Sequence, residues 1–314
     1  MNSTFPQLLS QWAKEVEAAL QHYFKPAAAP PLLYDAMAYS LFAGGKRIRP
    51  ILAMLGAEIC GQPRQNALPA ACALECIHVY SLIHDDLPAM DNASLRRGKP
   101  ANHKVFGEAI GILAGDGLLT YAFELLAEHY PQNCSALVLE LAKAAGPEGM
   151  VGGQTLDMIA PQKTFLTSAF ASLNFQSPPS NPPQQLLERI HRLKTGALLK
   201  TSIKLGALVA QAPKEQLDAI EQYGHHLGLA FQIVDDILDT IGANTGKTAT
   251  DLDNQKLTYP ALFGLETSKN LAQQAYQKAI HALEIFPNSP AKNHLENLAK
   301  FVVEQYHTKN NPST

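Results

Sequence analysis

Apolar residues recur at helical spacing along almost the entire chain, and the strict alternation of a half-buried strand is nearly absent. The pattern predicts helices over residues 8–24, 32–43, 50–60, 67–87, 106–130, 135–157, 184–211, 214–240, 257–283 and 291–306. Aromatic residues are only 7% of the chain, so leucine, alanine and isoleucine are expected to form the core, and these residues suit helices. We therefore expect an all-α fold. Because no repeat and no linker is visible, one domain over residues 1–314 is the simplest organisation.

One segment departs from this pattern. Residues 160–183 end with four prolines in six positions, surrounded by serine and asparagine. This composition favours an exposed, mobile loop over a packed element. A short helix near Leu166–Leu173 is the alternative.

Charge and composition exclude several classes of protein. The net charge of −3 leaves no basic excess for a nucleic-acid backbone. The first twenty residues lack the apolar stretch of a signal peptide, and no membrane span is expected because no run of about 18 apolar residues is free of charge. Cys72 and Cys76 are four residues apart, but no second ligand pair accompanies them, so buried thiols are favoured over a metal site. A cytoplasmic protein is expected.

The strongest functional signal is a pair of acidic clusters about 150 residues apart. Each lies near the end of a predicted apolar helix. The clusters are Asp85, Asp86 and Asp91 in HDDLPAMD, and Asp235, Asp236 and Asp239 in QIVDDILD.

The spacing within each cluster suits metal binding. Asp235 and Asp239 share one face of a helix. Pro88 cannot continue an undistorted helix, and the bend it causes is expected to bring Asp91 back towards Asp85. Solvated helix ends are the alternative, but carboxylates at a helix C-terminus face its negative pole at a cost of about 0.3–1 kcal/mol each. Oxygen ligands select Mg²⁺ or Mn²⁺ over zinc, and magnesium completes its shell with water and phosphate oxygens.

Two basic clusters support a phosphate ligand. The first is the turn Gly44-Gly45-Lys46-Arg47-Ile48-Arg49-Pro50, and the second is Arg96-Arg97-Gly98-Lys99, which follows the first acidic cluster. Arginine forms bidentate contacts with phosphate, and lysine supplies a point charge. Together with the aspartates, they indicate an anion held by metal on one side and by cations on the other.

In this order of motifs the chain resembles the trans-isoprenyl diphosphate synthases, and most of all the bacterial farnesyl diphosphate synthases. The resemblance covers nearly the whole chain. The matching blocks are GGKRIRP, CIHVYSLIHDDLPAMDNASLRRGKP, FGEAIGILAGD, MVGGQTLDM, RIHRLKTGALL, FQIVDDILD and LTYPAL. It implies an all-α bundle of roughly ten or more helices around a central cavity, and a homodimer.

The resemblance also implies roles for single residues. Metal ligands are expected among Asp85, Asp86, Asp91, Asp235 and Asp239, with three Mg²⁺ ions holding the allylic diphosphate and Mn²⁺ as a substitute. The same diphosphate is expected to contact Arg96, Lys194, Lys247 and Lys256. Isopentenyl diphosphate is expected at Gly45, Lys46, Arg49, His78 and Arg97. Thr195 and Gln232 occupy positions that stabilise the allylic cation.

The implied reaction is the Mg²⁺-dependent condensation of isopentenyl diphosphate with dimethylallyl or geranyl diphosphate. Ionisation of the allylic substrate is followed by attack of the isopentenyl double bond and loss of a proton, with the departed diphosphate as the base. Tyr80 lies five residues before Asp85, roughly 7–8 Å along a helix, and its ring is expected to stop the growing chain. Ser81 beside it is too small to do so. This favours farnesyl diphosphate, with geranylgeranyl diphosphate as the alternative product.

Three other readings compete. A terpene cyclase would not need the GGKRIRP turn, and its second metal motif normally differs from DDILD. A metal-dependent phosphohydrolase would use the His84-Asp85 pair, but it needs further histidine ligands, for which His78 and His103 are poor candidates. A helical scaffold without activity would have no need for both aspartate clusters.

Overall fold

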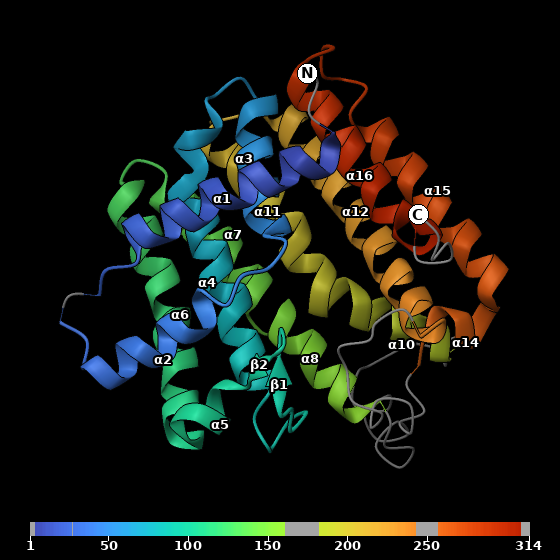
Figure 1. The fold of residues 1–314 in the computed structure, drawn as a ribbon. Helices are drawn as coiled ribbons and strands as arrows, with labels where there is room; N and C mark the ends of the chain where they lie inside the picture. The colour runs from blue at the N-terminus through green and yellow to red at the C-terminus, as the bar shows by residue number, and fades with distance from the viewer. Residues whose placement is uncertain (1–3, 27, 161–181, 243–256, 309–314) are drawn as a thin grey trace. The chain divides into compact units, whose positions relative to one another are not determined.

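The computed structural model describes residues 4–26, 28–160, 182–242 and 257–308 (Figure 1). Within them the regular secondary structure is helical apart from one small hairpin, which confirms the all-α fold class. The helical elements are α1 Phe5–Tyr23, α2 Pro31–Leu41, α3 Ile48–Ile59, η1 Arg64–Ala67, α4 Leu68–Asp85, α5 Asn102–Phe106, α6 Glu108–His129, α7 Cys134–Ala145, α8 Met150–Ile159, α10 Pro182–His191, η2 Arg192–Gly196, α11 Ala197–Val209, α12 Lys214–Thr240, α14 Tyr259–Phe263, α15 Leu265–Ala282 and α16 Pro290–Thr308. Strands β1 Leu95–Arg96 and β2 Lys99–Pro100 form the hairpin.

The chain divides into two compact units. The first is Met1–Leu141 with Ser202–Leu217, and the second is Ala142–Thr201 with Asp218–Thr314. The single domain expected from the sequence stays a prediction.

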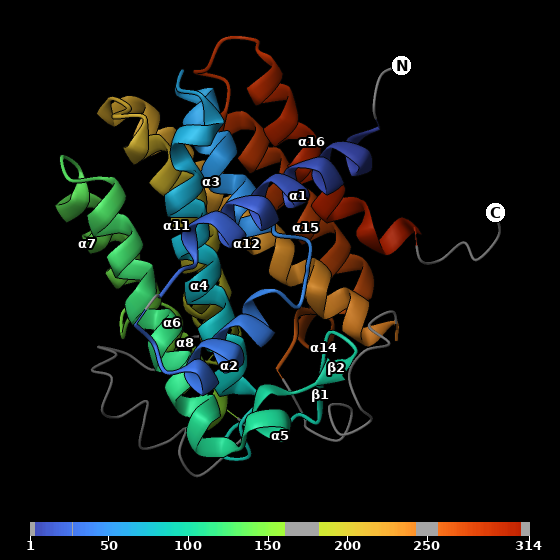
Figure 2. The same ribbon diagram turned by 60° about the vertical axis from the view of Figure 1, so that its left-hand side comes forward.

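The core of the first unit is built on α3 and α4. Leu52, Leu55, Leu74 and Ile77 are fully buried in these two helices, since both are apolar around most of their circumference. Helix α4 lies beside α6 (Figures 1 and 2), and α1 packs on α3 and α4. The buried position of α4 matters for function because the first acidic cluster follows directly from its last turn.

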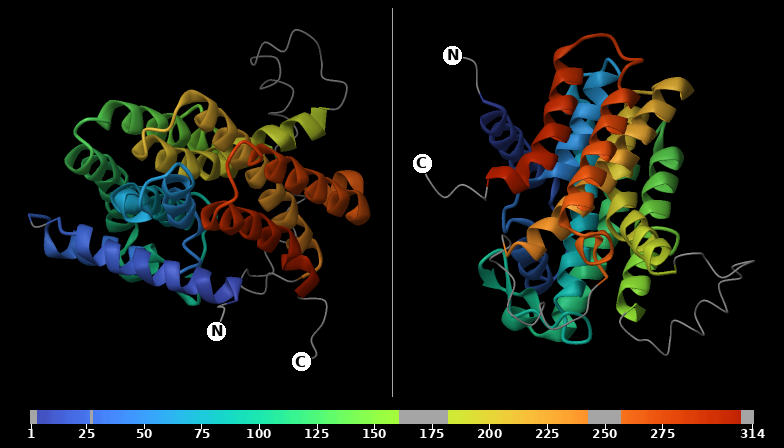
Figure 3. Two further views of the ribbon diagram at one scale, coloured as in Figure 1. Left: turned by 90° about the horizontal axis from the view of Figure 1, so that it is seen from above. Right: turned by 90° about the vertical axis from the view of Figure 1, so that its right-hand side faces the viewer.

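The core of the second unit surrounds the end of α12. Ile233, Val234 and Ile237 of this helix form one apolar cluster with Leu187 of α10 and Tyr259 of α14. Helices α15 and α16 run side by side, as Figure 3 shows in both views. The second acidic cluster is therefore carried by a helix whose other faces are fixed by packing.

Two predicted helices are interrupted in the structure. The helix predicted over 135–157 is wrong as a single element, because Pro147 has no N–H to donate and α7 and α8 are separate helices on either side of it. The helix predicted over 257–283 is broken at Gly264, where a φ of 78° lies outside the right-handed helical region. The hairpin was not predicted, although positive φ values at Arg97 and Gly98 fit a two-residue hairpin turn.

The helix predicted over 184–211 contains a wider turn. Residues Arg192–Gly196 form a π-helical turn, η2, between α10 and α11. Single π turns within α-helices are frequent at functional sites, because the extra residue changes the direction of the side chains that follow. This turn carries Lys194 and Thr195.

Two described helical segments are long and apolar enough to cross a membrane by length and composition, Arg64–Asp85 and Glu108–His129. The apolar window of the first is 72% buried inside the protein, as expected for a core helix. In the second, only 44% is buried, and Ile112 and Leu113 are exposed on it. The chain therefore covers only part of the apolar surface of α6.

Candidate active site and family

The end of α4 brings the first acidic cluster together in the first unit. Asp85 is the last residue of the helix, and the backbone N–H of Asp91 donates to its carbonyl oxygen at 2.9 Å. The N–H of Asn92 closes the same turn on the carbonyl oxygen of Leu87 at 3.0 Å. The expectation that the chain bends at Pro88 and returns Asp91 to Asp85 is confirmed. Asp91 is exposed and Asp85 is half-buried.

Asp86 is turned into the protein. Its residue is 2% exposed, and the Nε of Arg96 donates to its Oδ1 at 2.9 Å, with Nη2 completing a close bidentate pair. Burial raises the pKa of Asp86, and the hydrogen bond and charge of Arg96 oppose that rise. Burial lowers the pKa of Arg96, but Asp86 outweighs it and the pKa is raised overall. The pair therefore joins the acidic turn to strand β1. The expected role of Asp86 in metal binding and that of Arg96 in diphosphate binding stay predictions.

The hairpin also joins the two basic clusters. Nη1 of Arg97 donates to the carbonyl oxygen of Gly44, so the guanidinium lies on the Gly44–Gly45 turn. A Cβ added at Gly45, where φ is 135°, would lie 2.9 Å from Cζ of Arg97. A side chain there would push the guanidinium of Arg97 away from the turn, and the φ of 135° itself favours glycine. Arg97 and the turn before Lys46, which the sequence predicted in one binding site, are neighbours.

Positive charges converge around His78 on α4. Burial lowers its pKa well below the usual value, and the charges of Arg49 and Arg97 add to the effect. Burial likewise lowers the pKa of Arg49 to about 10, where Glu75 opposes the shift and Arg97 adds to it. Nε of Arg49 is buried without a hydrogen-bond partner among the described residues. A cluster of like charges next to a buried unpaired donor is suited to bind an anion.

Arg47 and Glu75 shape this site. The sequence counted Arg47 among the cations for phosphate, which is wrong because its guanidinium is buried against carboxylates, and it assigned Glu75 no role. Arg47 has a φ of 50°, a left-handed conformation that is costly for a residue with a side chain. Its guanidinium is buried and pairs with Glu75, which is 1% exposed, and with Glu17 at 2.6 Å, while Nη2 donates to the carbonyl oxygen of Leu41. These contacts fix the turn on which Lys46 and Arg49 lie.

Tyr80 occupies the position predicted to limit chain length. Its side chain is buried, and its ring contacts that of His84 edge to face, with 5.8 Å between centroids. Burial raises the pKa of Tyr80 to about 12, and the charge of Asp85 contributes. The hydroxyl of Ser81 donates to the carbonyl oxygen of His78 and is satisfied within the helix. Nε2 of His84 lies 3.0 Å from the carbonyl oxygen of Ile112. This contact engages one ring nitrogen of the histidine that a phosphohydrolase would use as a metal ligand.

In the second unit, the π turn η2 presents Lys194 and Thr195. Nζ of Lys194 lies 2.5 Å from Oδ2 of Asp157 on α8, and both side chains are about one third exposed. A Cβ at Gly153 would lie 2.1 Å from the backbone nitrogen of Lys194, so a glycine is required where α8 meets the turn. Asp157 holds Lys194 as a counter-ion, and no sequence signal identified this pairing.

The second acidic cluster lies in the last turns of α12. Gln232, Asp235 and Asp239 are half-buried and occupy positions i, i+3 and i+7 of one helix face. Asp236 points elsewhere: the N–H of Tyr259 donates to its Oδ2 at 2.9 Å, and Nε2 of His191 lies 3.8 Å from its Oδ1. None of the five predicted side chains on η2 and α12 lines the groove described below. They are Lys194, Thr195, Gln232, Asp235 and Asp239.

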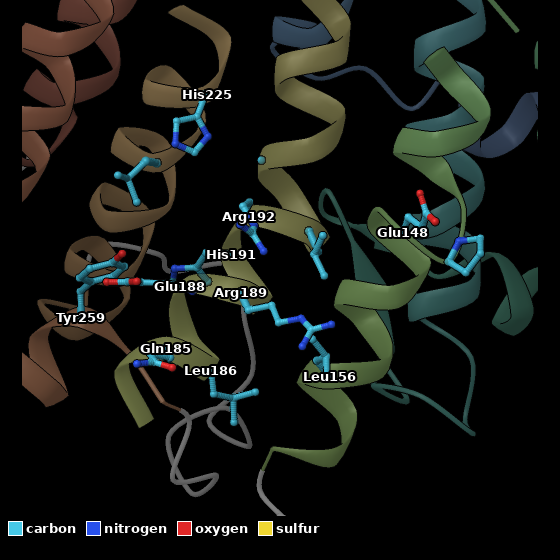
Figure 4. Close-up of a pocket in the computed structure, with 14 residues that line it drawn as sticks. Glu148, Leu156, Gln185, Leu186, Glu188, Arg189, His191, Arg192, His225 and Tyr259 are labelled. Carbon is cyan, nitrogen blue, oxygen red and sulfur yellow. The ribbon is translucent and has the colours of Figure 1, made fainter. Parts of the chain in front are cut away.

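That groove, of about 830 Å³, lies in the second unit around α10 and η2 (Figure 4). Figure 4 shows His191 and Glu188 directed towards Tyr259, while Arg189 points to the opposite side, towards Leu156. The size of the groove is not evidence that it binds the allylic substrate, because its lining includes Leu193 and Gly196 of η2 but not Lys194 or Thr195.

Comparison with known proteins identifies the family. The polyprenyl synthetase family model matches residues 30–288. The chain belongs to the polyprenyl synthetase family. A farnesyl diphosphate synthase of Geobacillus stearothermophilus is 50% identical over 84% of this chain and 86% of its own, and a geranylgeranyl diphosphate synthase of Cyanophora paradoxa is 42% identical over 89% and 90%. A solved geranyltransferase from Legionella pneumophila aligns with a TM-score of 0.80 at 34% identity, covering 97% of this chain and 98% of its own.

The described residues that could hold a metal are pairs of carboxylates. Among the described residues, no group of three or more His, Cys, Asp and Glu side chains surrounds one point. Asp85 with Asp91, and Asp235 with Asp239, supply oxygen donors only. Such pairs fit Mg²⁺, which commonly takes one or two carboxylates and completes its shell with water and substrate phosphate.

Some predictions about this synthetase lie outside the described residues. They concern Lys247, Lys256 and most of the loop predicted over residues 160–183. All four cysteines are free, with Cys72 and Cys76 buried, which confirms the prediction of buried thiols for that pair. Burial is the largest cause of the raised pKa of Cys72 and of Cys76.

Proposed function

We propose that this polyprenyl synthetase joins isopentenyl diphosphate head to tail (1′–4) with dimethylallyl or geranyl diphosphate, giving (2E,6E)-farnesyl diphosphate and diphosphate. The observation that carries the proposal is the convergence of Arg49, His78 and Arg97 on one unit, beside an acidic turn that ends the same helix. An anion site and a metal site on one scaffold are what a transferase of diphosphate esters needs. The 50% identity to a farnesyl diphosphate synthase supports the product class.

Isopentenyl diphosphate is held by the basic cluster of the first unit. Lys46 and Arg49 contact the diphosphate, the turn being fixed by Arg47, and Arg97 contacts it from the hairpin. The neutral ring of His78 donates one hydrogen bond without adding charge. Each of these contacts is charge-assisted or buried, and each is worth about 1.5–3 kcal/mol.

The allylic diphosphate is served by both acidic clusters. Asp85 and Asp91, and Asp235 and Asp239, would supply the carboxylates for three Mg²⁺ ions, for which Mn²⁺ could substitute. When bound, the ions neutralise the leaving diphosphate. Lys194 moves from Asp157 to the diphosphate, and Lys247 and Lys256 add further positive charge. The hydroxyl of Thr195 and the amide oxygen of Gln232 stabilise the allylic cation, and the released diphosphate accepts the proton.

The enzyme is proposed to be a cytoplasmic homodimer. Free cysteines agree with a reducing compartment. Ile112 and Leu113 are 45% and 51% exposed on α6, an apolar face that a second copy would cover.

Incubation of the protein with isopentenyl diphosphate, geranyl diphosphate and Mg²⁺ tests the proposal. We expect a C15 diphosphate by mass, together with inorganic diphosphate, and neither in EDTA. Geranylgeranyl diphosphate is the second candidate product, because a synthase of that product is 42% identical. A C20 product would select it, and hydrolysis of geranyl diphosphate without elongation would refute both.

A further inference from the structure

Asp236 has a role distinct from that of its neighbours in the second acidic cluster. Successive residues of a helix are about 100° apart, so Asp236 is turned away from Asp235 and lies to one side of the face that Asp235 and Asp239 share. It continues the row of His225 and Leu229, which line the groove of Figure 4. Its side chain is only 13% exposed.

The Asp236 carboxylate lies next to residues of two other helices, α14 and α10. The N–H of Tyr259, at the start of α14, donates to Oδ2 at 2.9 Å. Nε2 of His191, at the end of α10, lies 3.8 Å from Oδ1. This distance is longer than a hydrogen bond. The imidazole ring therefore limits the space open to the carboxylate and places a polar group beside it.

The two supporting residues also contact one another. The rings of His191 and Tyr259 lie 5.5 Å apart between centroids and are inclined by 31°. Both residues are buried, at 9% and 4% exposure. Burial lowers the pKa of His191 to about 4, with Asp157 opposing the shift and Lys194 adding to it, so the ring is neutral near pH 7. The contact with Asp236 is consequently not an ion pair.

We infer that His191 and Tyr259 are positioning residues, which hold Asp236 and thereby fix the rotation of the α12 end that presents Asp235 and Asp239 to metal. His191 directly precedes the π turn that carries Lys194 and Thr195. The same imidazole thus fixes the position of the acidic cluster relative to the lysine and threonine of the turn. The inference rests on the proposed metal-dependent function.

Loss of this support is expected to weaken metal binding more than folding. Residues that orient a metal ligand without touching the metal typically contribute about 10–100-fold in affinity or activity. We therefore expect His191→Leu to raise the Mg²⁺ concentration needed for half-maximal binding of inorganic diphosphate by about tenfold or more. His191→Gln, which keeps a polar side chain of similar length beside Asp236, should recover most of the loss.

The experiment is a calorimetric titration of the full chain with inorganic diphosphate at several Mg²⁺ concentrations. The variants are His191→Leu, His191→Gln, Tyr259→Phe, which keeps the ring and the backbone donor, and His225→Leu as the matched control. His225 lies in the same groove about 16 Å along α12 from Asp236, and should leave the Mg²⁺ requirement unchanged. In steady-state assays, His191→Leu should leave the KM for isopentenyl diphosphate unaltered.

Three results would overturn the inference. They are an unchanged Mg²⁺ requirement in His191→Leu, an equal loss in His225→Leu, and a loss that follows the melting temperature and is shared by His191→Gln. If the unmodified protein binds diphosphate without any metal dependence, the proposed metal-dependent function is wrong. His191 and Tyr259 would then have no metal site to position. The wild-type titration separates that outcome from the other three.

Discussion

Replacement of Tyr80 by alanine should lengthen the product by about one isoprene unit. The ring is buried one helical turn before the acidic cluster. A cavity of about 150 Å³ holds a six-carbon benzene ring, so a void left by removing the six-carbon ring of Tyr80 is of the size that one five-carbon unit fills. The expected shift is from C15 to C20.

The same substitution should destabilise the protein. Removal of a large buried aromatic side chain costs about 3–5 kcal/mol, of which the cavity contributes about 24 cal/mol for each Å³. A bound C20 product fills the void and returns part of this loss. Tyr80→Ala should therefore melt at a lower temperature than the wild type, and its melting temperature should rise more on addition of geranylgeranyl diphosphate.

Mass analysis of the dephosphorylated products is the assay. Tyr80→Phe keeps the ring and should still stop at C15, and Ser81→Ala should do the same because the serine hydroxyl is already bonded within the helix. If Tyr80→Ala is folded and active yet still releases C15, the ring does not limit the chain. A C20 product from both Ser81→Ala and Tyr80→Ala would indicate general loosening of α4 instead.

Three further outcomes test the site. Asp85→Ala should lower turnover by orders of magnitude with an unchanged melting temperature; near-normal turnover would remove Asp85 from the metal ligands. Arg49→Ala should raise the KM for isopentenyl diphosphate about 10–100-fold and more than that for geranyl diphosphate, from a charge-assisted contact of about 1.5–3 kcal/mol; equal effects on both would contradict the division of the two diphosphates. Glu75→Ala should destabilise the fold by about 3–5 kcal/mol, because Arg47 keeps a buried charge without its main partner; denaturant unfolding measures this, and a loss below 1 kcal/mol would show that Glu17 suffices.

The sequence predicted those parts of the site that local spacing determines. The return of Asp91 to Asp85 follows from a proline three residues after the helix end, and the shared face of Asp235 and Asp239 follows from helical geometry. The break at Pro147 was also readable, since proline in a helix interior removes a hydrogen bond, but the apolar periodicity on both sides concealed it.

The supporting residues were not predictable in the same way. Arg47 and Glu75 are 28 positions apart, and Lys194 and Asp157 are 37 apart. Nothing in the spacing of either pair identifies the partner, because each contact depends on which helix faces come together in the folded protein. Asp86 is a case in which the motif alone was a poor guide. The motif suggests a metal ligand, whereas packing of the hairpin pairs the carboxylate with Arg96.

The π turn has a consequence for how this chain can change by insertion and deletion. A π turn contains one residue more than the α-helical turn it replaces, and its hydrogen bonds run from i to i+5. Deletion of a single residue between Arg192 and Gly196 would convert the π turn into an ordinary α turn, so that α10 would continue into α11 as a regular helix. Such a deletion would improve the backbone geometry while moving Lys194 and Thr195 out of phase with Gly153. The length of this segment is therefore constrained: a substitution can leave the backbone of the turn intact, whereas a deletion removes the turn that presents Lys194 and Thr195.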